Sequence, residues 1–308
     1  MKILIVGAGS TGGYFGARLT QAGRDVSFLV RPARAAALRE GGLQVLSPRG
    51  NFSVEPRLVL ADEIDAPFDI VLVTVKAFAL PAAMEDFAAA VGPETMILPV
   101  LNGMKHIDDL QARFGAEHVV GGVCRVSTML DAQGRIVHLA PLHELVYGEL
   151  DGRSSARIEA LHAFMSDAGF DAQLSAHIAQ DLWNKWILLA TLGGLCTLAR
   201  GNIGEIVASD GGADLARAFL AEAAAVAGAA GFTPSAQALE FIAGVLTAPG
   251  SPMTSSMYRD LTSGGRVEAD QILGDLRARA RQAGISTPLV SAAYIQLDVY
   301  QRRRGAAA

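Results

Sequence analysis

A glycine pattern near the start of the chain constrains its fold more than any other feature. Residues 2–6, KILIV, form a short apolar run typical of a buried strand, and Gly7-x-Gly9-x-x-Gly12 follows at once. Residues 12–23 have the pattern of a helix, and residues 25–30 have that of a second strand. A glycine loop in this setting predicts a strand–helix–strand unit that binds a dinucleotide.

Each glycine has a separate role in such a loop. Gly7 permits a tight turn, Gly9 lets the backbone approach a pyrophosphate, and Gly12 allows the helix to pack closely on the strand. The N-terminus of the helix then supplies free N–H groups and a positive dipole end for the phosphates. The alternative is a glycine-rich turn without a ligand. We expect the whole loop to bind the cofactor: Gly7, Ala8, Gly9, Ser10, Thr11 and Gly12.

An arginine ends the second strand, where an NAD-binding site usually carries Asp or Glu for the ribose 2′-hydroxyl. This residue, Arg31, stands about twenty residues after the loop. An acid at this position would repel a 2′-phosphate, whereas a guanidinium grips it in a fork. The sequence therefore favours NADPH/NADP+ over NAD as the cofactor. The alternative is that Arg31 is an ordinary surface charge.

Strand and helix patterns alternate through the first half of the chain and then give way to helices. Residues 119–148 have the pattern of three successive antiparallel strands, and from residue 177 nearly every segment is helix-like. We therefore predict an α/β fold with two domains. Residues 1–176 form an N-terminal Rossmann-type doubly wound sheet that binds NADP, and residues 177–308 form an all-α C-terminal domain that carries substrate and catalysis.

The bulk composition excludes several classes of protein. A net charge of −5 and scattered arginines favour neither nucleic acid nor a membrane surface as a partner. Cys124 and Cys196 lie far apart, so we expect small buried residues and no metal site. The longest apolar stretch, residues 186–199, is shorter than the roughly 18 residues that a membrane span needs. We expect a cytoplasmic protein.

Two polar residues follow predicted strands directly. Lys76 stands just past the strand in VTVKAF, and Asn102 does the same in VLNGM. In doubly wound sheets, ligands bind outside the carboxyl ends of the strands, so both are candidates for the binding site. Asn102–Gly103 is equally compatible with a simple turn, and Lys76 with a solvated loop lysine.

A lysine stands between the only two tryptophans, in DLWNKWILLA. On a helix, Asp181, Lys185, Leu189 and Gly193 share one face, which is polar at one end and apolar at the other. Such a stripe suggests the rim of a pocket. A lysine, unlike an arginine, can donate its proton to a developing alkoxide and be recharged. The alternative is a lysine whose stem covers apolar surface while its charge pairs with Asp181.

Seven segments together resemble the ketopantoate reductase (2-dehydropantoate 2-reductase) family over essentially the whole chain. They are KILIVGAGSTGG, LVR, TVKAF, LNGM, DLWNKW, SSMYRDLTSGGRVEAD and GISTP, in family order. The resemblance implies reduction of a 2-oxo acid to a 2-hydroxy acid with NADPH, ketopantoate being the default substrate.

The resemblance also implies roles for individual residues. Lys185 matches the family's catalytic lysine, which protonates the carbonyl oxygen, and Glu268 matches an essential glutamate that contacts the cofactor. Asn102 matches an asparagine near the nicotinamide and the substrate, and Ser256 matches a substrate-binding serine. Arg31 and Lys76 match residues on the phosphate and ribose side of NADP. Without the resemblance, Ser256 suggests only a helix cap and Glu268 only a solvated acid.

The sequence departs from the family where the substrate is bound. The resemblance implies asparagines four and eight positions after the lysine, where this chain has Leu189 and Gly193. A further expected asparagine corresponds to Ile203, although Asn202 is adjacent. Losing hydrogen-bonding groups changes substrate choice by large factors. We therefore expect a paralogue that accepts a more apolar or differently substituted 2-oxo acid.

Two other functions stay open at this point. One is a dehydrogenase for a 3-hydroxy acid with the same architecture, and the other is a non-catalytic NADP-binding sensor, against which Lys185 and Glu268 argue. The sequence does not fix the oligomeric state, although its alanine- and glycine-rich helices could supply the close-packed surfaces of a homodimer. The physiological pathway is also not readable.

Overall fold

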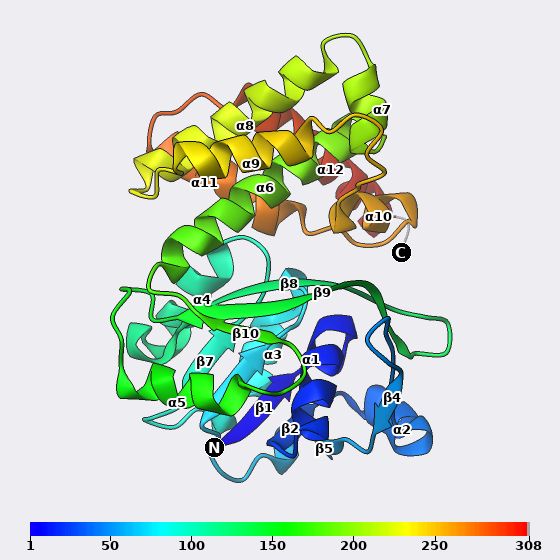
Figure 1. Cartoon of the computed structure of the whole chain (residues 1–308), viewed down its shortest axis with the longest axis vertical. Helices are drawn as coiled ribbons and strands as arrows, with labels where there is room; N and C mark the ends of the chain where they lie inside the picture. The colour runs from blue at the N-terminus through cyan, green and yellow to red at the C-terminus, as the bar shows by residue number, and fades with distance from the viewer. Residues whose placement is uncertain (307–308) are drawn as a thin grey trace. The chain divides into compact units, whose positions relative to one another are not determined.

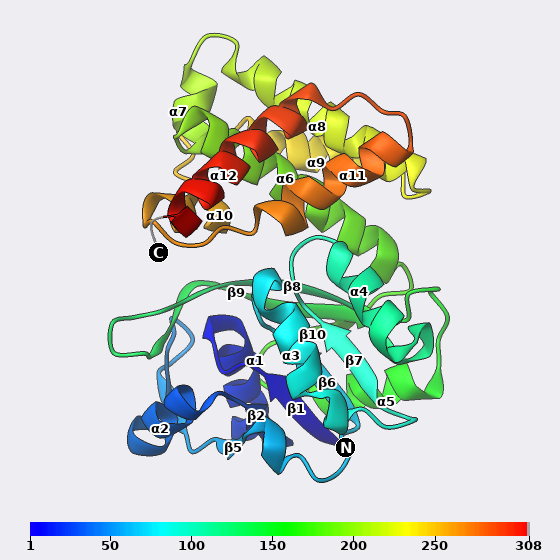
Figure 2. The ribbon, with the colours of Figure 1, turned by 180° about the vertical axis from the view of Figure 1, so that it is seen from behind.

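A computed structural model describes residues 1–306, which form two compact units. The first unit comprises Met1–Leu101 and His106–Ala179. The second comprises Asn102–Lys105 and the residues from Gln180 onward. The short segment 102–105 thus packs with the helical unit, although it lies within the first half of the sequence. Figures 1 and 2 show the chain from opposite sides.

A five-stranded parallel sheet forms the centre of the first unit. Apart from the edge strand β5, its strands are mostly apolar and buried on both faces, as a sheet covered on both sides requires. The chain moves outward from β1 in one direction and then in the other, which leaves a switch point beside β1. In the order β5-β2-β1-β6-β7, the strands are Arg57–Val59, Asp25–Leu29, Lys2–Val6, Ile70–Val73 and Met96–Pro99.

Helices cover both faces of this sheet. Gly16 of α1 packs on Phe28 of β2, and Gly13 of the same helix packs on Ile136 of a second sheet, so α1 lies between the two sheets. Figure 2 shows α3 on the opposite face. The helices of this unit are α1 (Ser10–Gln21), α2 (Pro32–Gly41), α3 (Leu80–Asp86), α4 (Lys105–Phe114) and α5 (Ala156–Met165).

The second sheet of this unit is mixed. Two strands that the sequence suggests within residues 119–148 are in fact one long strand, β9, which bulges opposite Val126–Thr128 of β8 and so continues through the apparent break. The prediction of three antiparallel strands there was wrong by one. The strands are β3 (Leu43–Leu46), β4 (Phe52–Val54), β8 (Gly121–Leu130), β9 (Ile136–Gly148) and β10 (Asp171–Leu174).

The second unit is helical, as predicted, and each break between its helices falls at a glycine- or proline-containing segment. It thereby confirms the α/β fold class with an all-α C-terminal part. Figure 1 shows these helices running from green to red. They are α6 (Ile178–Ala199), α7 (Ile203–Ala208), α8 (Gly212–Ala229), α9 (Ala236–Leu246), α10 (Ser256–Thr262), α11 (Asp275–Gln282) and α12 (Pro288–Ala306), with a π-helical turn over Asp270–Gly274.

Helix α6 is the core helix of this unit. Its 22 residues exceed the apolar stretch that the sequence suggests. Among the described residues it is the one helix long and apolar enough to cross a membrane, and 67% of its most apolar window is buried inside the protein. Such burial is typical of a core helix in a globular protein.

Candidate active site

The glycine loop has the geometry that its sequence predicts. Gly7 has a φ of +96°, which favours glycine, and a Cβ on Gly12 would overlap the Thr74 hydroxyl and the Gly7 carbonyl. The Thr74 hydroxyl donates to the Val6 carbonyl at 2.9 Å and fixes the loop against β6. A Cβ on Gly9 would meet no atom within 4 Å, so the space over this glycine is open. Close contacts therefore fix the loop at Gly7 and Gly12, whereas its surface at Gly9 is accessible.

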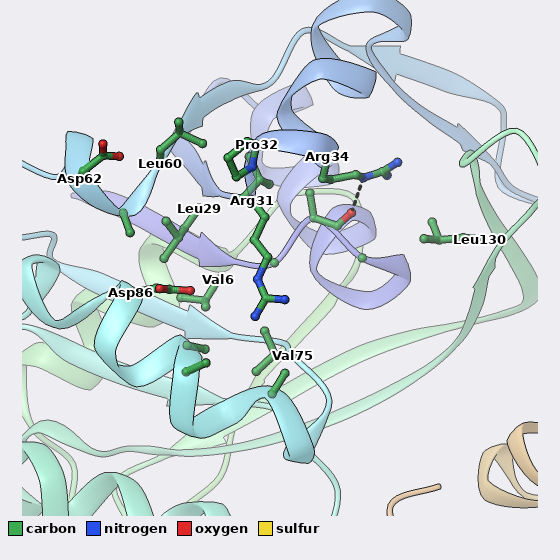
Figure 3. A pocket seen from close by; sticks show the side chains of 18 residues that line it. Val6, Leu29, Arg31, Pro32, Arg34, Leu60, Asp62, Val75, Asp86 and Leu130 are labelled. Atoms are coloured by element: carbon green, nitrogen blue, oxygen red, sulfur yellow. Dashed lines mark hydrogen bonds between the residues drawn. The ribbon is translucent and has the colours of Figure 1, made fainter. Parts of the chain in front are cut away.

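A cavity of about 600 Å³ opens beside this loop, entirely within the first unit. Gly7, Ala8 and Gly9 line it together with Arg31, which follows the end of β2. Figure 3 shows the Arg31 side chain reaching into the cavity toward Val75. The cavity thus combines open backbone at a helix N-terminus with a guanidinium, a combination that fits the phosphates and ribose of a dinucleotide.

A second arginine lines the same cavity, and sequence reasoning missed it. Arg34 lies in the first turn of α2, where its Nε donates to the Ala8 carbonyl at 3.3 Å (Figure 3). Its Nη2 donates to the Gly134 carbonyl, also at 3.3 Å. Burial lowers the pKa of its guanidinium. The signal that could have revealed it is the spacing in LVRPAR, which puts two arginines three residues apart at a helix start.

Lys76 lies next to this cavity but does not line it. It is exposed and precedes the short helix Ala77–Ala79, while its neighbour Val75 lines the cavity and Lys76 does not. The role of Lys76 as a ligand of the cofactor stays a prediction.

The stripe that carries Lys185 has the burial of a pocket rim. Positions 181, 184, 185, 188 and 189 of α6 are partly exposed, whereas residues 190–197 are buried all round. Lys185 therefore stands where one accessible face of the helix runs into the core of the second unit.

Three segments far apart in sequence are joined at this helix. The Trp186 indole N–H donates to the Ile272 carbonyl at 2.9 Å, which ties α6 to the turn that follows Glu268. The Gln271 side-chain amide donates to the Asn102 carbonyl, also at 2.9 Å. Gly103 packs so closely that a Cβ would lie 2.6 Å from the Gln271 carbonyl, and its φ of +86° also requires glycine. The elements that carry Lys185, Glu268 and Asn102 are thus fastened to one another within the second unit.

Glu268 is not the solvated acid, and Ser256 is not the helix cap, that the sequence suggests without the family resemblance. Glu268 is only 7% exposed, so it is not a solvated acid. The cap of α10 is Ser255, whose hydroxyl accepts from the Tyr258 N–H at 2.9 Å, and not Ser256, which is the first residue of the helix. The Ser256 hydroxyl is therefore not committed to the helix cap.

Helix α10 packs against α6 beyond the lysine. A Cβ on Gly193 would lie 2.7 Å from the terminal methyl of Met257, so this methyl fills the space beside the glycine. Cys196 lies on the same part of α6, and burial raises the pKa of its thiol, while a backbone hydrogen bond from Ser255 opposes that rise. Cys196 is buried, as expected, and Cys124 only partly so. The start of α10, including Ser256, is thereby held next to the Lys185 helix.

At Ile203, one of the positions that depart from the family pattern, no neighbouring side chain replaces the missing asparagine. Ile203 is fully buried. The adjacent Asn202 is engaged as the cap of α7, where its side chain accepts from the Glu205 N–H at 2.9 Å while Glu205 accepts from the Asn202 N–H at 2.8 Å. Asn202 is therefore not placed to replace the asparagine missing at Ile203.

Comparison with known proteins identifies relatives along the whole chain. The family model described as ketopantoate reductase PanE/ApbA matches residues 3–152, and its C-terminal counterpart matches residues 177–301. An uncharacterized oxidoreductase of Bacillus subtilis (strain 168), YkpB, is 36% identical over 305 residues, which cover 99% of this chain and 100% of the relative.

Solved structures agree with these matches. The crystal structure of 2-dehydropantoate 2-reductase from Geobacter metallireducens superposes with a TM-score of 0.87 at 31% identity, over 97% of this chain and 99% of that one. The ternary structure of a D-mandelate dehydrogenase with NADH and anilino(oxo)acetate shares the fold, with a TM-score of 0.89 at 23% identity over 99% and 100% of the two chains. The chain therefore belongs to the ketopantoate reductase family of NAD(P)-dependent oxidoreductases.

Proposed function

We propose that this protein reduces the keto group of a 2-oxo acid to a 2-hydroxy acid with NADPH, and that Lys185 is the general acid. The observation that carries the proposal is the fastening of the segments bearing Lys185, Glu268 and Asn102 into one cluster by the Trp186 and Gln271 hydrogen bonds. When bound, NADPH supplies the hydride that the carbonyl carbon accepts.

Lys185 acts on the carbonyl oxygen of the substrate. Its Nζ donates a hydrogen bond to that oxygen, stabilises the negative charge that develops there, and transfers a proton to it. The position supports this role, since it is partly exposed and borders the buried part of α6. The charge of Lys185 is then felt more strongly than it would be in bulk water.

Polar side chains of neighbouring segments orient the reactants. The carboxylate of Glu268, 7% exposed, holds the cofactor and helps to set the active site. The Asn102 amide contacts the nicotinamide end and the substrate, and the Ser256 hydroxyl binds the substrate. Gln271 holds the Asn102 backbone carbonyl in place, which limits the region that the Asn102 side chain can reach.

The preference for NADPH rests on Arg31. Its side chain enters the cavity beside the glycine loop, where the cavity is lined by Gly7, Ala8 and Gly9. A guanidinium at this point binds a 2′-phosphate through two parallel hydrogen bonds, an arrangement that the ribose hydroxyl of NADH cannot reproduce.

The substrate is proposed to be more apolar than ketopantoate. Leu189, Gly193 and Ile203 stand where the family resemblance implies asparagines. The methyl of Met257 fills the space beside Gly193, and Asn202 is occupied as a helix cap. A hydroxyl on the substrate would lose its partners at these positions, which costs about 1–3 kcal/mol for each buried polar group left unpaired.

The test is NADPH oxidation with a panel of 2-oxo acids: ketopantoate, 2-oxoisovalerate, 4-methyl-2-oxopentanoate and phenylglyoxylate. The last is included because a D-mandelate dehydrogenase shares the fold. We expect an apolar or aromatic 2-oxo acid to give the highest kcat/KM, and NADPH to exceed NADH. Ketopantoate as the best substrate would contradict the proposed substrate class but not the reaction.

The role of the lysine is tested with Lys185→Ala. We expect kcat to fall by about 10²–10⁴-fold, because this is the usual contribution of a general acid, while NADPH still binds. Lys2→Ala, which removes a lysine from β1 of the first unit, is the matched control and should keep full turnover. An unchanged kcat in Lys185→Ala would exclude the lysine as general acid. No turnover by the parent protein on any 2-oxo acid would favour a 3-hydroxy acid dehydrogenase or a sensor instead.

A further inference from the structure

The cofactor cavity contains a cation that the proposed function does not use. Arg34 is half-buried at the start of α2, and its two hydrogen-bond acceptors are the backbone carbonyls of Ala8 and Gly134. Across residues 1–306, no carboxylate is paired with its guanidinium. Carbonyl oxygens are neutral, and bonds of 3.3 Å are slightly longer than usual. The charge of Arg34 is therefore not neutralised within the protein.

The two acids that line the cavity lie away from Arg34. Figure 3 shows Asp62 and Asp86 on one side, Arg34 on the side toward Leu130, and Arg31 between them. The electrostatic potential of the cavity is therefore uneven, and Arg34 stands at the end away from the two acids. A dianionic group is most stable at that end.

The tip of the β8–β9 hairpin supports this end of the cavity. Gly134 has a φ of +75°, and a Cβ on it would lie 3.1 Å from Nη1 of Arg34, so the tip and the guanidinium are in close contact. Leu130 of the same hairpin contributes to the cavity wall. The hydrogen bonds to Ala8 and Gly134 thus hold the guanidinium between the glycine loop and the hairpin, with several of its N–H donors uncommitted.

We infer that Arg34 is, besides Arg31, a second ligand of the 2′-phosphate of the cofactor. The two arginines together set the preference of this protein for NADP(H). This inference rests on the proposed function, because it concerns the same cofactor. Arg31 is exposed, whereas Arg34 is half-buried and donates to two backbone carbonyls. A held guanidinium loses less conformational entropy on binding and therefore contributes more to discrimination.

A different role for Arg34 would leave a different signature. If the side chain only braces the hairpin against the glycine loop, its removal weakens every adenosine ligand to the same degree. If it binds the 2′-phosphate, only ligands that carry this phosphate are affected. The two roles are separated by comparing 2′,5′-ADP with 5′-AMP, which differ by that phosphate alone.

The experiment is calorimetric titration of the full-length protein with these two nucleotides, without substrate. We expect the parent protein to bind 2′,5′-ADP more tightly than 5′-AMP. Arg34→Gln should weaken 2′,5′-ADP by about 10- to 100-fold, the usual effect of losing a charged hydrogen bond, and leave 5′-AMP within about twofold. Arg34→Lys should retain part of the preference, since it keeps the charge but not the fork.

Arg39→Gln is the matched control, because Arg39 lies on the same helix, is exposed and does not line the cavity. Equal weakening of both nucleotides by Arg34→Gln, or no weakening of either, would overturn the inference. The preference for NADPH itself would fail at an earlier step, if the parent protein bound 5′-AMP as tightly as 2′,5′-ADP. The oxo-acid panel tests the reaction independently of both results.

Discussion

The glycine loop and the lysine cluster are two functional regions built in opposite ways. The loop is continuous in sequence, and its shape follows from which residues lack a side chain, as at Gly7 and Gly12. The lysine cluster gathers its elements from residues around 102, 185 and 271, and hydrogen bonds from two side chains to distant backbone carbonyls hold it together. One region is specified locally, and the other is specified by tertiary contacts.

This contrast explains what each region tolerates. A local backbone motif fails when a side chain is added to it, because the surrounding atoms, which include the Gly7 carbonyl, are already closely packed. An assembly of distant segments fails when one fastening bond is removed, because the reactive groups then lose their alignment. Three predictions follow, from the largest expected effect to the smallest; the first two test these modes of failure, and the third compares the acid sensitivity of the two units.

The largest effect is expected at Gly12. In Gly12→Ala, the new methyl would overlap Thr74 and the Gly7 carbonyl, so we expect the free energy of unfolding to fall by about 3 kcal/mol. Gly9→Ala is the matched variant, since its methyl would meet no atom within 4 Å. We expect Gly9→Ala to keep the parent stability within about 0.5 kcal/mol but to weaken NADP+ by about tenfold or more through a lost phosphate hydrogen bond. Urea denaturation and calorimetry measure both quantities.

Equal stability of these two glycine variants would contradict the division of roles within the loop. It would mean that α1 can shift away from β6 without cost, and that the loop is less rigidly specified than its backbone contacts imply.

The second effect concerns the fastening of α6. Trp186→Phe keeps a buried aromatic ring but removes the N–H that donates to the Ile272 carbonyl. We expect the free energy of unfolding to fall by about 1–3 kcal/mol and kcat to fall by about tenfold, with NADPH affinity preserved. Trp183→Phe is the control, since Trp183 is equally buried and stacks on Phe232 but has no such bond among the described residues. A larger loss of kcat in Trp183→Phe would mean that packing, and not the hydrogen bond, aligns the lysine.

The smallest effect is a difference in acid sensitivity. All six histidines of the chain precede residue 178, so the helical unit has none. His143, 3% exposed, lies with its Nδ1 2.6 Å from the Tyr14 hydroxyl. Its pKa is lowered from 6.5, first by burial and then by the charges of Arg49, His138 and Arg18, against an opposing contribution of Asp171.

The direction of the pH effect follows from this shift. Below pH 6.5 the unfolded chain takes up a proton at His143 that the folded chain does not, so the stability of the first unit is complete above this pH and is lost as the pH falls further. Both tryptophans lie in the helical unit, so their fluorescence reports that unit and circular dichroism reports the whole chain. We expect acidification from pH 7 to 5 to lower the melting temperature more by circular dichroism than by fluorescence. His143→Gln should reduce that difference, while His177→Gln, at an exposed site, should not.

Much of the first unit could be predicted because its signals are local. Buried parallel strands are continuous apolar runs, and the glycine spacing indicates a particular turn. The errors arise where a local signal misleads: the pattern of residues 119–148 suggests three strands, but β9 continues through the apparent break with a bulge. Arg34 was missed because its importance depends on the distant Gly134.

The candidate site of the second unit was accessible from sequence only through family resemblance. Nothing near Lys185 indicates that Gln271 reaches the Asn102 carbonyl, 169 residues away, because no periodicity encodes such a pairing. The burial of Glu268 and the capping role of Ser255 in place of Ser256 are likewise consequences of tertiary packing.

The assignment of residues 102–105 to the helical unit has a consequence for the order in which the protein can be completed during synthesis. These four residues leave the ribosome long before Gln271, yet the helical unit includes them. The first unit can therefore collapse early around its parallel sheet, but this loop must wait for a late partner. A fragment that begins at residue 177 would lack the loop altogether. A 1–176 fragment would carry the loop without Gln271, whose side chain donates to it in the full chain.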